Sequence, residues 1–142
     1  MGWHDAKVYA MAFFSDTKTF DNELIFDLDY IFQWLNPAPP SANFSFWIAP
    51  CTLVFKDVYR LKIDLDAQPP NSFDFEILDI DRLDEHTYPN GVPYWDWHIV
   101  TPNGDIDFEA SGYEQVVRQA PVHAPSQEFQ GRGATSFSRK PF

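Results

Sequence analysis

The residues of this sequence best placed to do chemistry near neutral pH are an aspartate and a histidine two positions apart. Asp96 and His98 lie in the segment Tyr94 to Thr101, whose apolar residues alternate as they do in a strand. Successive side chains of a strand point to opposite faces, so Asp96 and His98 share one face. A carboxylate can orient an imidazole for proton transfer, and the two groups together can ligate a metal ion. A plain solvent face opposite a core face formed by Trp95 and Trp97 explains the same pattern, and we favour that interpretation.

His4 is the other candidate ligand-binding residue, and Asp5 is its nearest carboxylate in the sequence. Adjacent residues of a regular strand point to opposite faces, so these two side chains can serve one site only where the backbone is irregular. A structural histidine, hydrogen-bonded near the start of the first strand, is the simpler interpretation.

Carboxylates recur at alternate positions along most of the chain. Each set can line one face of a strand and could build a cation site or an acid/base pair with a neighbouring set. Because nearly every expected strand shows this pattern, we interpret the carboxylates as hydrated outer faces. The sets are Asp27 and Asp29, Asp64 and Asp66, Asp74 and Glu76, Asp79 and Asp81, and Asp105, Asp107 and Glu109.

Other reactive motifs are missing from the sequence. Cys51 is the single cysteine and lies in the apolar run Cys51 to Phe55, where burial raises the pKa of a thiol. No serine is framed as Gly-x-Ser-x-Gly, and there is no glycine-rich phosphate loop, dinucleotide fingerprint or twelve-residue calcium loop. We therefore assign no catalytic residue, no metal ligand and no cofactor.

The net charge restricts the partners. The chain holds 10 Lys and Arg against 21 Asp and Glu, a formal charge of −11. Residues 118–142 contain four cations against Glu128, which is +3 and leaves −14 on residues 1–117. Such a charge repels nucleic acid and anionic membranes, so we expect neither as a partner.

The elements that must position these residues are strands, because apolar residues recur with a period of two. Residues 24–34 form a long strand with Asp27 and Asp29 on its wet face, after a first hairpin that begins near Val8. Tyr94 to Thr101 and Asp105 to Ala110 form a second hairpin around Asn103-Gly104. About eight strands predict an all-β antiparallel barrel or sandwich. The expected core is Leu28, Tyr30, Phe32, Phe46, Leu53, Phe75, Ile77, Trp97, Ile99 and Phe108.

The remaining segments are expected to connect or terminate this domain. Pro50 should lie at a bulge or at an unpaired position, and the polar residues 81–93 form a long connection. Residues 113–118 fit either a helical turn or a strand, and we favour a strand. We expect one domain over residues 1–120 and an irregular tail over 121–142, with Gly131-Arg132-Gly133 as a flexible segment.

Four segments carry a resemblance to known proteins: Trp3 to Ala6, Phe26 to Ile31, Phe46 to Phe55 and Ala110 to Arg118. They resemble a small bacterial family of all-β proteins that has no assigned activity. The resemblance covers roughly residues 3–120; it implies one all-β domain and assigns no catalytic or binding residue. Some similarly built small acidic proteins are immunity proteins of bacterial toxin systems, which is an analogy of fold alone.

Two classes of function follow. The one we favour is a non-enzymatic acidic binding protein that recognises a basic protein partner, because it needs no catalytic constellation. The alternative is a ligand-binding barrel or a hydrolase-type enzyme with a polar cavity near Asp96 and His98. One cysteine, no secretory leader and no apolar run of about 20 residues predict a soluble, cytoplasmic protein.

Overall fold

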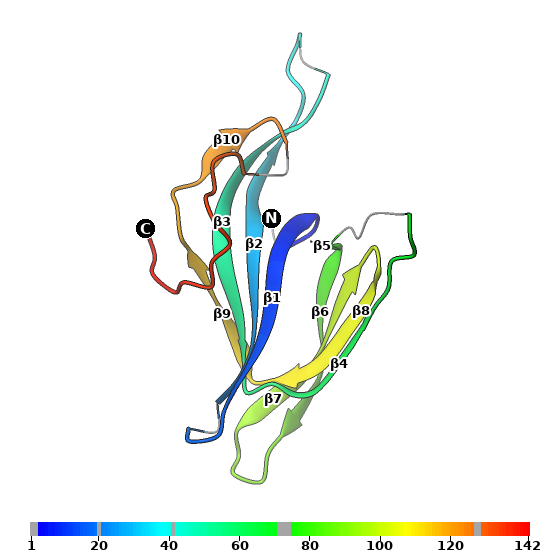
Figure 1. Ribbon diagram of the computed structural model, residues 1–142, viewed down its shortest axis with the longest axis vertical. Coiled ribbons are helices and arrows are strands. Elements are labelled where there is room, and N and C mark those ends of the chain that lie inside the picture. Colours follow the sequence, from blue (N-terminus) through cyan, green and yellow to red (C-terminus); the bar gives the residue numbers. More distant parts are fainter. Residues whose placement is uncertain (1–2, 20, 41, 71–74, 127–128) are drawn as a thin grey trace.

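The computed structural model describes residues 3–19, 21–40, 42–70, 75–126 and 129–142 (Figure 1). Within these residues the chain forms ten strands and no helix, which confirms the all-β prediction. The strands are β1 (Ala6–Asp16), β2 (Asp21–Leu35), β3 (Ser45–Lys56), β4 (Tyr59–Leu65), β5 (Glu76–Ile77), β6 (Asp79–Thr87), β7 (Pro93–Thr101), β8 (Gly104–Ala110), β9 (Gly112–Val117) and β10 (Val122–Ala124).

The strands form two antiparallel sheets. The larger sheet has the order β10-β3-β2-β1-β5, with β9 also paired to β3, and the smaller sheet has the order β4-β8-β7-β6. Figure 1 shows the two sheets diverging from a shared corner at which β4 and β8 meet the larger sheet. The sheets are not closed into a barrel, so of the two predicted architectures the structure has the sandwich.

At this corner the chain passes from one sheet to the other twice. The chain passes from β3 to β4 through Asp57, which has a φ of 54°, and from β8 to β9 through Ser111. The amide of Ser111 donates to the carbonyl of Lys56 over 3.0 Å, and its hydroxyl donates to the Asp57 carboxylate over 2.5 Å. Residues 112–117 are therefore the strand we favoured, which continues β8 into the larger sheet.

The two predicted hairpins are confirmed as β1–β2 and β7–β8. In the second hairpin Thr101 pairs with Gly104, which has a φ of 138°. A Cβ atom at Gly104 would lie 1.9 Å from the carbonyl oxygen of Asp64 in β4. Only glycine allows the turn to come this close to the neighbouring strand.

The core lies between the sheets and is centred on Phe55 of β3. Its ring lies 6.2 Å from that of Phe26, 5.1 Å from that of Trp97 and 4.8 Å from that of Phe108. Seven of the ten predicted core residues are buried; six of them lie in this core, whereas Phe46 packs in a separate cluster with Ile31, Ile48, Ala124 and Phe129. Tyr30, Phe32 and Phe75 are half-buried against the core between the sheets. The seven are Leu28, Phe46, Leu53, Ile77, Trp97, Ile99 and Phe108.

Residues 81–93 do not form the long connection that we predicted, because β6 occupies most of them. This strand lies at the edge of the smaller sheet, and its one partner among the described strands is β7. Charged residues that face solvent are typical of edge strands, since they discourage pairing with another chain. The sequence of β6 therefore lacks the apolar alternation by which the other strands were predicted.

Pro50 lies inside β3, where one of its two neighbours changes. On that side the pairing with β9 ends at Val117 and the pairing with β10 begins at Val122. The carbonyl of Pro50 accepts a hydrogen bond from the amide of Arg118 over 2.9 Å in this gap. The missing N–H of proline faces the same side, where neither β9 nor β10 pairs with Pro50; on its other side Pro50 lies opposite Asp29 of β2, so the position is unpaired on one side only.

The segment after β9 packs along the outer face of the larger sheet (Figure 1). The hydroxyl of Thr52 in β3 donates to the carbonyl of Ser138 over 2.6 Å, and the amide of Phe142 donates to Val117 over 3.1 Å. Because this segment covers β2, residues 24–29 are buried on both faces. The prediction of a wet face for Asp27 and Asp29 is therefore wrong.

The position of Phe55 generates a stability prediction. Phe55→Ala removes a ring that contacts both sheets and should lower the free energy of unfolding by about 3 to 5 kcal/mol. Phe13→Ala is the control, because Phe13 is 47% exposed, and it should change that energy by less than about 0.5 kcal/mol. Urea denaturation measures both; equal effects would show that the core is not centred on Phe55.

Candidate functional site

The most deeply buried charged groups form a cluster, here called the Asp–Arg cluster, of Asp27, Asp29, Arg118 and Arg132. Both aspartates of β2 have no exposed surface, and both arginine side chains are less than one-tenth exposed. Arg132 donates from Nη2 to Asp27 over 2.6 Å and from Nε to Asp29 over 3.1 Å. Arg118 donates to Asp27 and to the carbonyl of Ser136. Two negative charges thus meet two positive charges out of contact with water.

Backbone and aromatic groups complete the Asp–Arg cluster. The amide of Ser136 donates to Asp27 over 2.9 Å, and the amide of Phe129 donates to Asp29 over 2.8 Å. Tyr9 of β1 donates its hydroxyl to Asp29 over 2.8 Å, and the Arg132 guanidinium lies 3.7 Å from the centre of the Tyr9 ring. Burial lowers the pKa of Arg132, but the bonds and charges of Asp27 and Asp29 outweigh burial and raise it.

This arrangement makes the Asp–Arg cluster a structural device that fastens the C-terminal segment to β2. The residues that we interpreted as a flexible Gly131-Arg132-Gly133 segment instead hold a side chain that is 8% exposed. We missed the cluster, although the excess of cations in residues 118–142 and the paired aspartates of residues 24–34 were both visible in the sequence.

Removal of one member of the Asp–Arg cluster should leave a buried charge without its partner. We expect Arg132→Met to lower the free energy of unfolding by about 3 to 5 kcal/mol. Arg139→Met is the matched control, because Arg139 pairs with Glu23 at 39% exposure and should cost less than about 1 kcal/mol. Thermal unfolding of the two variants measures this, and a loss for Arg132→Met no larger than that for Arg139→Met would contradict the structural role.

A second set of carboxylates lies on the outer face of the smaller sheet. The strands of this sheet hold nine carboxylates against three cations. The strands of the larger sheet hold seven carboxylates against two lysines, and residues 118–142 add a net charge of +3 to that sheet. In β7 and β8 the alternate positions, among them Trp97, Ile99 and Phe108, are buried, so the carboxylates point outward. We call this surface the acidic face; it consists of Asp64, Asp79, Asp81, Asp96, Asp105, Asp107 and Glu109.

Like charges lie directly opposite each other on the acidic face. Asp64 of β4 pairs with Asp105 of β8. Asp96 of β7 pairs with Glu109 of β8. Directly opposed like charges destabilise a sheet, so the fold retains this surface at a cost in stability.

His98 lies within the acidic face and is paired with Asp107 rather than Asp96. Its Nδ1 lies 2.6 Å from Asp107 Oδ1, its Nε2 lies 3.8 Å from Asp105, and Asp81 is its partner on β6. The hydrogen bond to Asp107 is the largest cause of a raised pKa for His98; burial opposes it, and the charges of Asp107, Asp105 and Asp81 add to the rise.

Asp96 shares the outer face of β7 with His98, as predicted, but it binds another histidine. His86 Nε2 on β6 lies 2.8 Å from Asp96 Oδ2, and this hydrogen bond raises the pKa of His86. The structure therefore brings both predicted residues to one surface and gives each a cross-strand partner. His86 and Asp107 are the partners that sequence spacing could not identify, because strand register determines them.

His4 lies at the other candidate position, ahead of β1. Its Nδ1 lies 2.9 Å from Asp5 Oδ2, and Asp5 has a φ of 63°, so the backbone is irregular enough for neighbours to meet. The His4 side chain is 70% exposed, and no further partner of this pair is found among the described residues.

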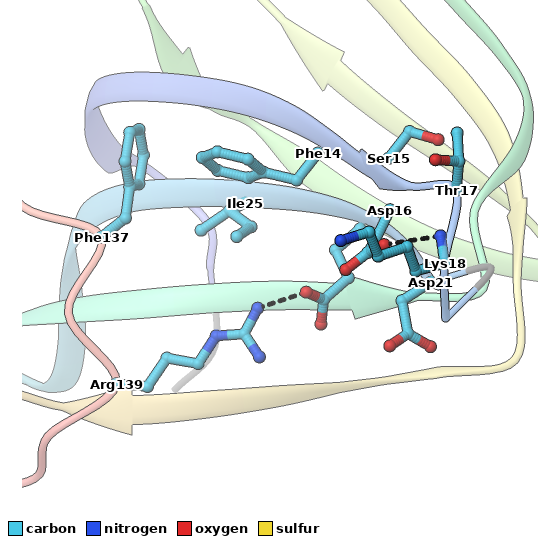
Figure 2. A pocket seen from close by; sticks show the side chains of 10 residues that line it. Phe14, Ser15, Asp16, Thr17, Lys18, Asp21, Ile25, Phe137 and Arg139 are labelled. Atoms are coloured by element: carbon cyan, nitrogen blue, oxygen red, sulfur yellow. Dashed lines mark hydrogen bonds and ion pairs between the residues drawn. The ribbon is translucent and has the colours of Figure 1, made fainter.

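The hollows of the described surface do not assemble these groups into a reaction centre. A hollow of about 230 Å³ beside Asp96 has Asp107 and Glu109 in its lining but not His98. A larger hollow of about 670 Å³, shown in Figure 2, lies between the β1–β2 hairpin and the C-terminal segment. Its charged groups serve structure: Arg139 pairs with Glu23 over 2.6 Å, and Asp16 accepts the amides of Lys18 and Thr19, which lowers the pKa of Asp16.

The remaining sequence candidate, Cys51, is an inert thiol. It is fully buried in β3, and burial raises its pKa to about 12. Within the described part of the chain, no group of three or more His, Cys, Asp and Glu residues is arranged to hold a metal ion. The described residues also contain no helix long and apolar enough to cross a lipid bilayer.

Comparison of the chain with protein-family models, with curated proteins and with solved structures finds no match. The resemblance to small bacterial all-β proteins therefore stays a prediction, and function must be argued from the surface itself.

The His98–Asp107 pair generates a pH prediction. The pKa of His98 should exceed its ordinary value of 6.5 and should fall towards that value in Asp107→Asn. Because the folded-state pKa is raised, the pair stabilises the fold fully below the unfolded-state pKa and loses this contribution as pH rises through the folded-state pKa. NMR titration of the imidazole protons measures both values. Asp81→Asn, which removes a charge but no hydrogen bond, is the control; an equal fall in both variants would contradict the assigned partner.

Proposed function

We propose that this protein is a non-enzymatic binding protein whose acidic face recognises a basic surface of a partner protein. The observation that carries the proposal is the separation of charge between the two sheets. Arg118, Arg132 and Arg139 bind carboxylates of the larger sheet, so the C-terminal segment offsets more than half of that sheet's negative charge and leaves the smaller sheet the more acidic one.

The opposed carboxylates support the same proposal. Asp64 and Asp105 repel each other in the free protein, whereas His86 binds Asp96 and Arg60 binds Glu109. Cations from a partner would relieve this repulsion, so part of the stability lost in the free protein is regained on binding. The field of the acidic face would also raise the association rate with a basic partner. A protein that binds nucleic acid presents such a basic surface.

The enzyme alternative receives less support from the geometry. A general base must reach a substrate held beside it, usually in a concave site. His98 instead lies on an open strand face, and the nearest hollow does not include it. The ligand-binding barrel also receives less support, since the two sheets do not close into a barrel.

The pair Asp64 and Asp105 allows a direct test. We expect Asp64→Asn/Asp105→Asn to raise the free energy of unfolding by about 0.2 to 1 kcal/mol, because the repulsion is removed. The same variant should bind the partner more slowly, because the acidic face has lost two charges. Gain of stability with loss of binding would show that the charges are kept for recognition.

Asp16→Asn/Asp21→Asn is the matched control. These two aspartates also lie opposite each other, but in the β1–β2 hairpin, away from the acidic face. The wild-type protein is used as bait in the source organism's lysate at low and raised salt, and association rates of the captured partner are then measured for each variant. Binding should weaken as salt shortens the Debye length to about 8 Å and below. Equal loss in both double variants, or the absence of a stoichiometric partner, would contradict the proposal.

A further inference from the structure

A row of aromatic rings borders the acidic face at the end of the smaller sheet. We call His86, Tyr94, Tyr88 and Tyr59 the aromatic row. Tyr94 stacks on His86 with 5.0 Å between ring centres and on Tyr88 with 4.1 Å. Tyr59 of β4 meets Tyr88 edge to face at 6.4 Å. The rings thus connect β6, β7 and β4, three of the strands that carry the acidic face.

The aromatic row ends in a hollow of about 500 Å³. This hollow is lined by Tyr59, Tyr88 and Asp57, together with Val92 and two other residues of the β6–β7 turn. The turn is held by its own backbone: the amide of Tyr88 donates to the carbonyl of Val92 over 2.9 Å, and Gly91 donates back to Tyr88 over 2.8 Å. The wall of the hollow that this turn forms is therefore in place before any ligand binds.

The lining offers both contacts that a cation prefers. The ring of Tyr59 is 45% exposed at the mouth of the hollow. Aromatic faces attract ammonium and guanidinium groups, and a nearby carboxylate adds direct charge attraction. Asp57 supplies that carboxylate; Glu109, opposite Tyr59 in the neighbouring strand, is already paired with Arg60 over 3.3 Å.

Tyr88 links the aromatic row to the hollow. Its hydroxyl oxygen is buried and has no hydrogen-bond partner among the described residues. Burial raises the pKa of Tyr88, and the charges of Glu109 and Asp57 add to it, so the hydroxyl stays neutral and able to accept a hydrogen bond.

We propose that this hollow binds a cationic side chain, lysine or arginine, projecting from the basic partner. The source of the cation rests on the proposed function, since the hollow lies beside the acidic face that would receive that partner. The acidic face would act at long range during encounter, and the hollow would anchor one residue at short range.

The test uses the full chain and three small probes: the N-acetyl methylamides of arginine, lysine and citrulline. Citrulline matches arginine in shape but is neutral. NMR titration of the tyrosine ring signals should show saturable shifts at Tyr59 and Tyr88 with arginine or lysine. We expect the better cation to bind about two- to fivefold more tightly than citrulline, as a partly exposed cation–π contact allows.

Tyr59→Leu keeps an apolar side chain and removes the ring face, so it should reduce the preference for the cation to the part that Asp57 supplies. Asp57→Asn should weaken it, and asparagine tolerates the positive φ at this position. Tyr113→Leu is the matched control, because Tyr113 is 49% exposed on β9 and its loss should leave the preference unchanged. Circular dichroism confirms that each variant is folded.

Equal binding of citrulline and the cations by the wild-type protein, or an unchanged preference in Tyr59→Leu, would overturn this inference. Such a result would leave the proposed function intact if partner binding still depended on Asp64 and Asp105. Conversely, cation binding at Tyr59 without any captured partner would support the hollow and contradict the proposed function.

Discussion

The buried contact between the aspartates of β2 and the arginines of the C-terminal segment determines which surfaces this protein presents. Asp27 and Asp29 cannot lie unpaired inside the fold, because an isolated buried charge costs several kcal/mol. Arg118 and Arg132 therefore have to come to β2, and the segment that carries them covers one sheet. The smaller sheet has no such cover among the described residues, so the excess negative charge of the chain appears there.

This division gives the proposed recognition surface two parts with different ranges. The acidic face acts over distances near the Debye length, so it influences how often a partner arrives in the correct orientation. The aromatic row acts only in contact, where ring faces and a carboxylate can hold one cation. His98 and His86 make the charge of this surface depend on pH, because each histidine carries more positive charge as pH falls and offsets the carboxylates beside it.

Much of the fold could be predicted from the sequence, because alternation and turn chemistry are local. The hairpin around Gly104 and the buried positions of Trp97 and Ile99 are examples. Burial of Asp27 could not be predicted by alternation, since the covering segment lies about a hundred residues away in the chain. The partner of His98 also depended on the pairing of β7 with β8, which spacing within one strand does not contain.

The most direct measurement of this account compares proton relaxation caused by a cationic and an anionic nitroxide probe in solution. If the smaller sheet carries the uncompensated charge, the cationic probe should relax the protons of β8 and of the outward residues of β7 more than the anionic probe does. Protons of residues 27–29 should respond weakly to both probes, because the C-terminal segment covers them. Equal relaxation by the two probes on both sheets, or strong relaxation at residues 27–29, would contradict the account.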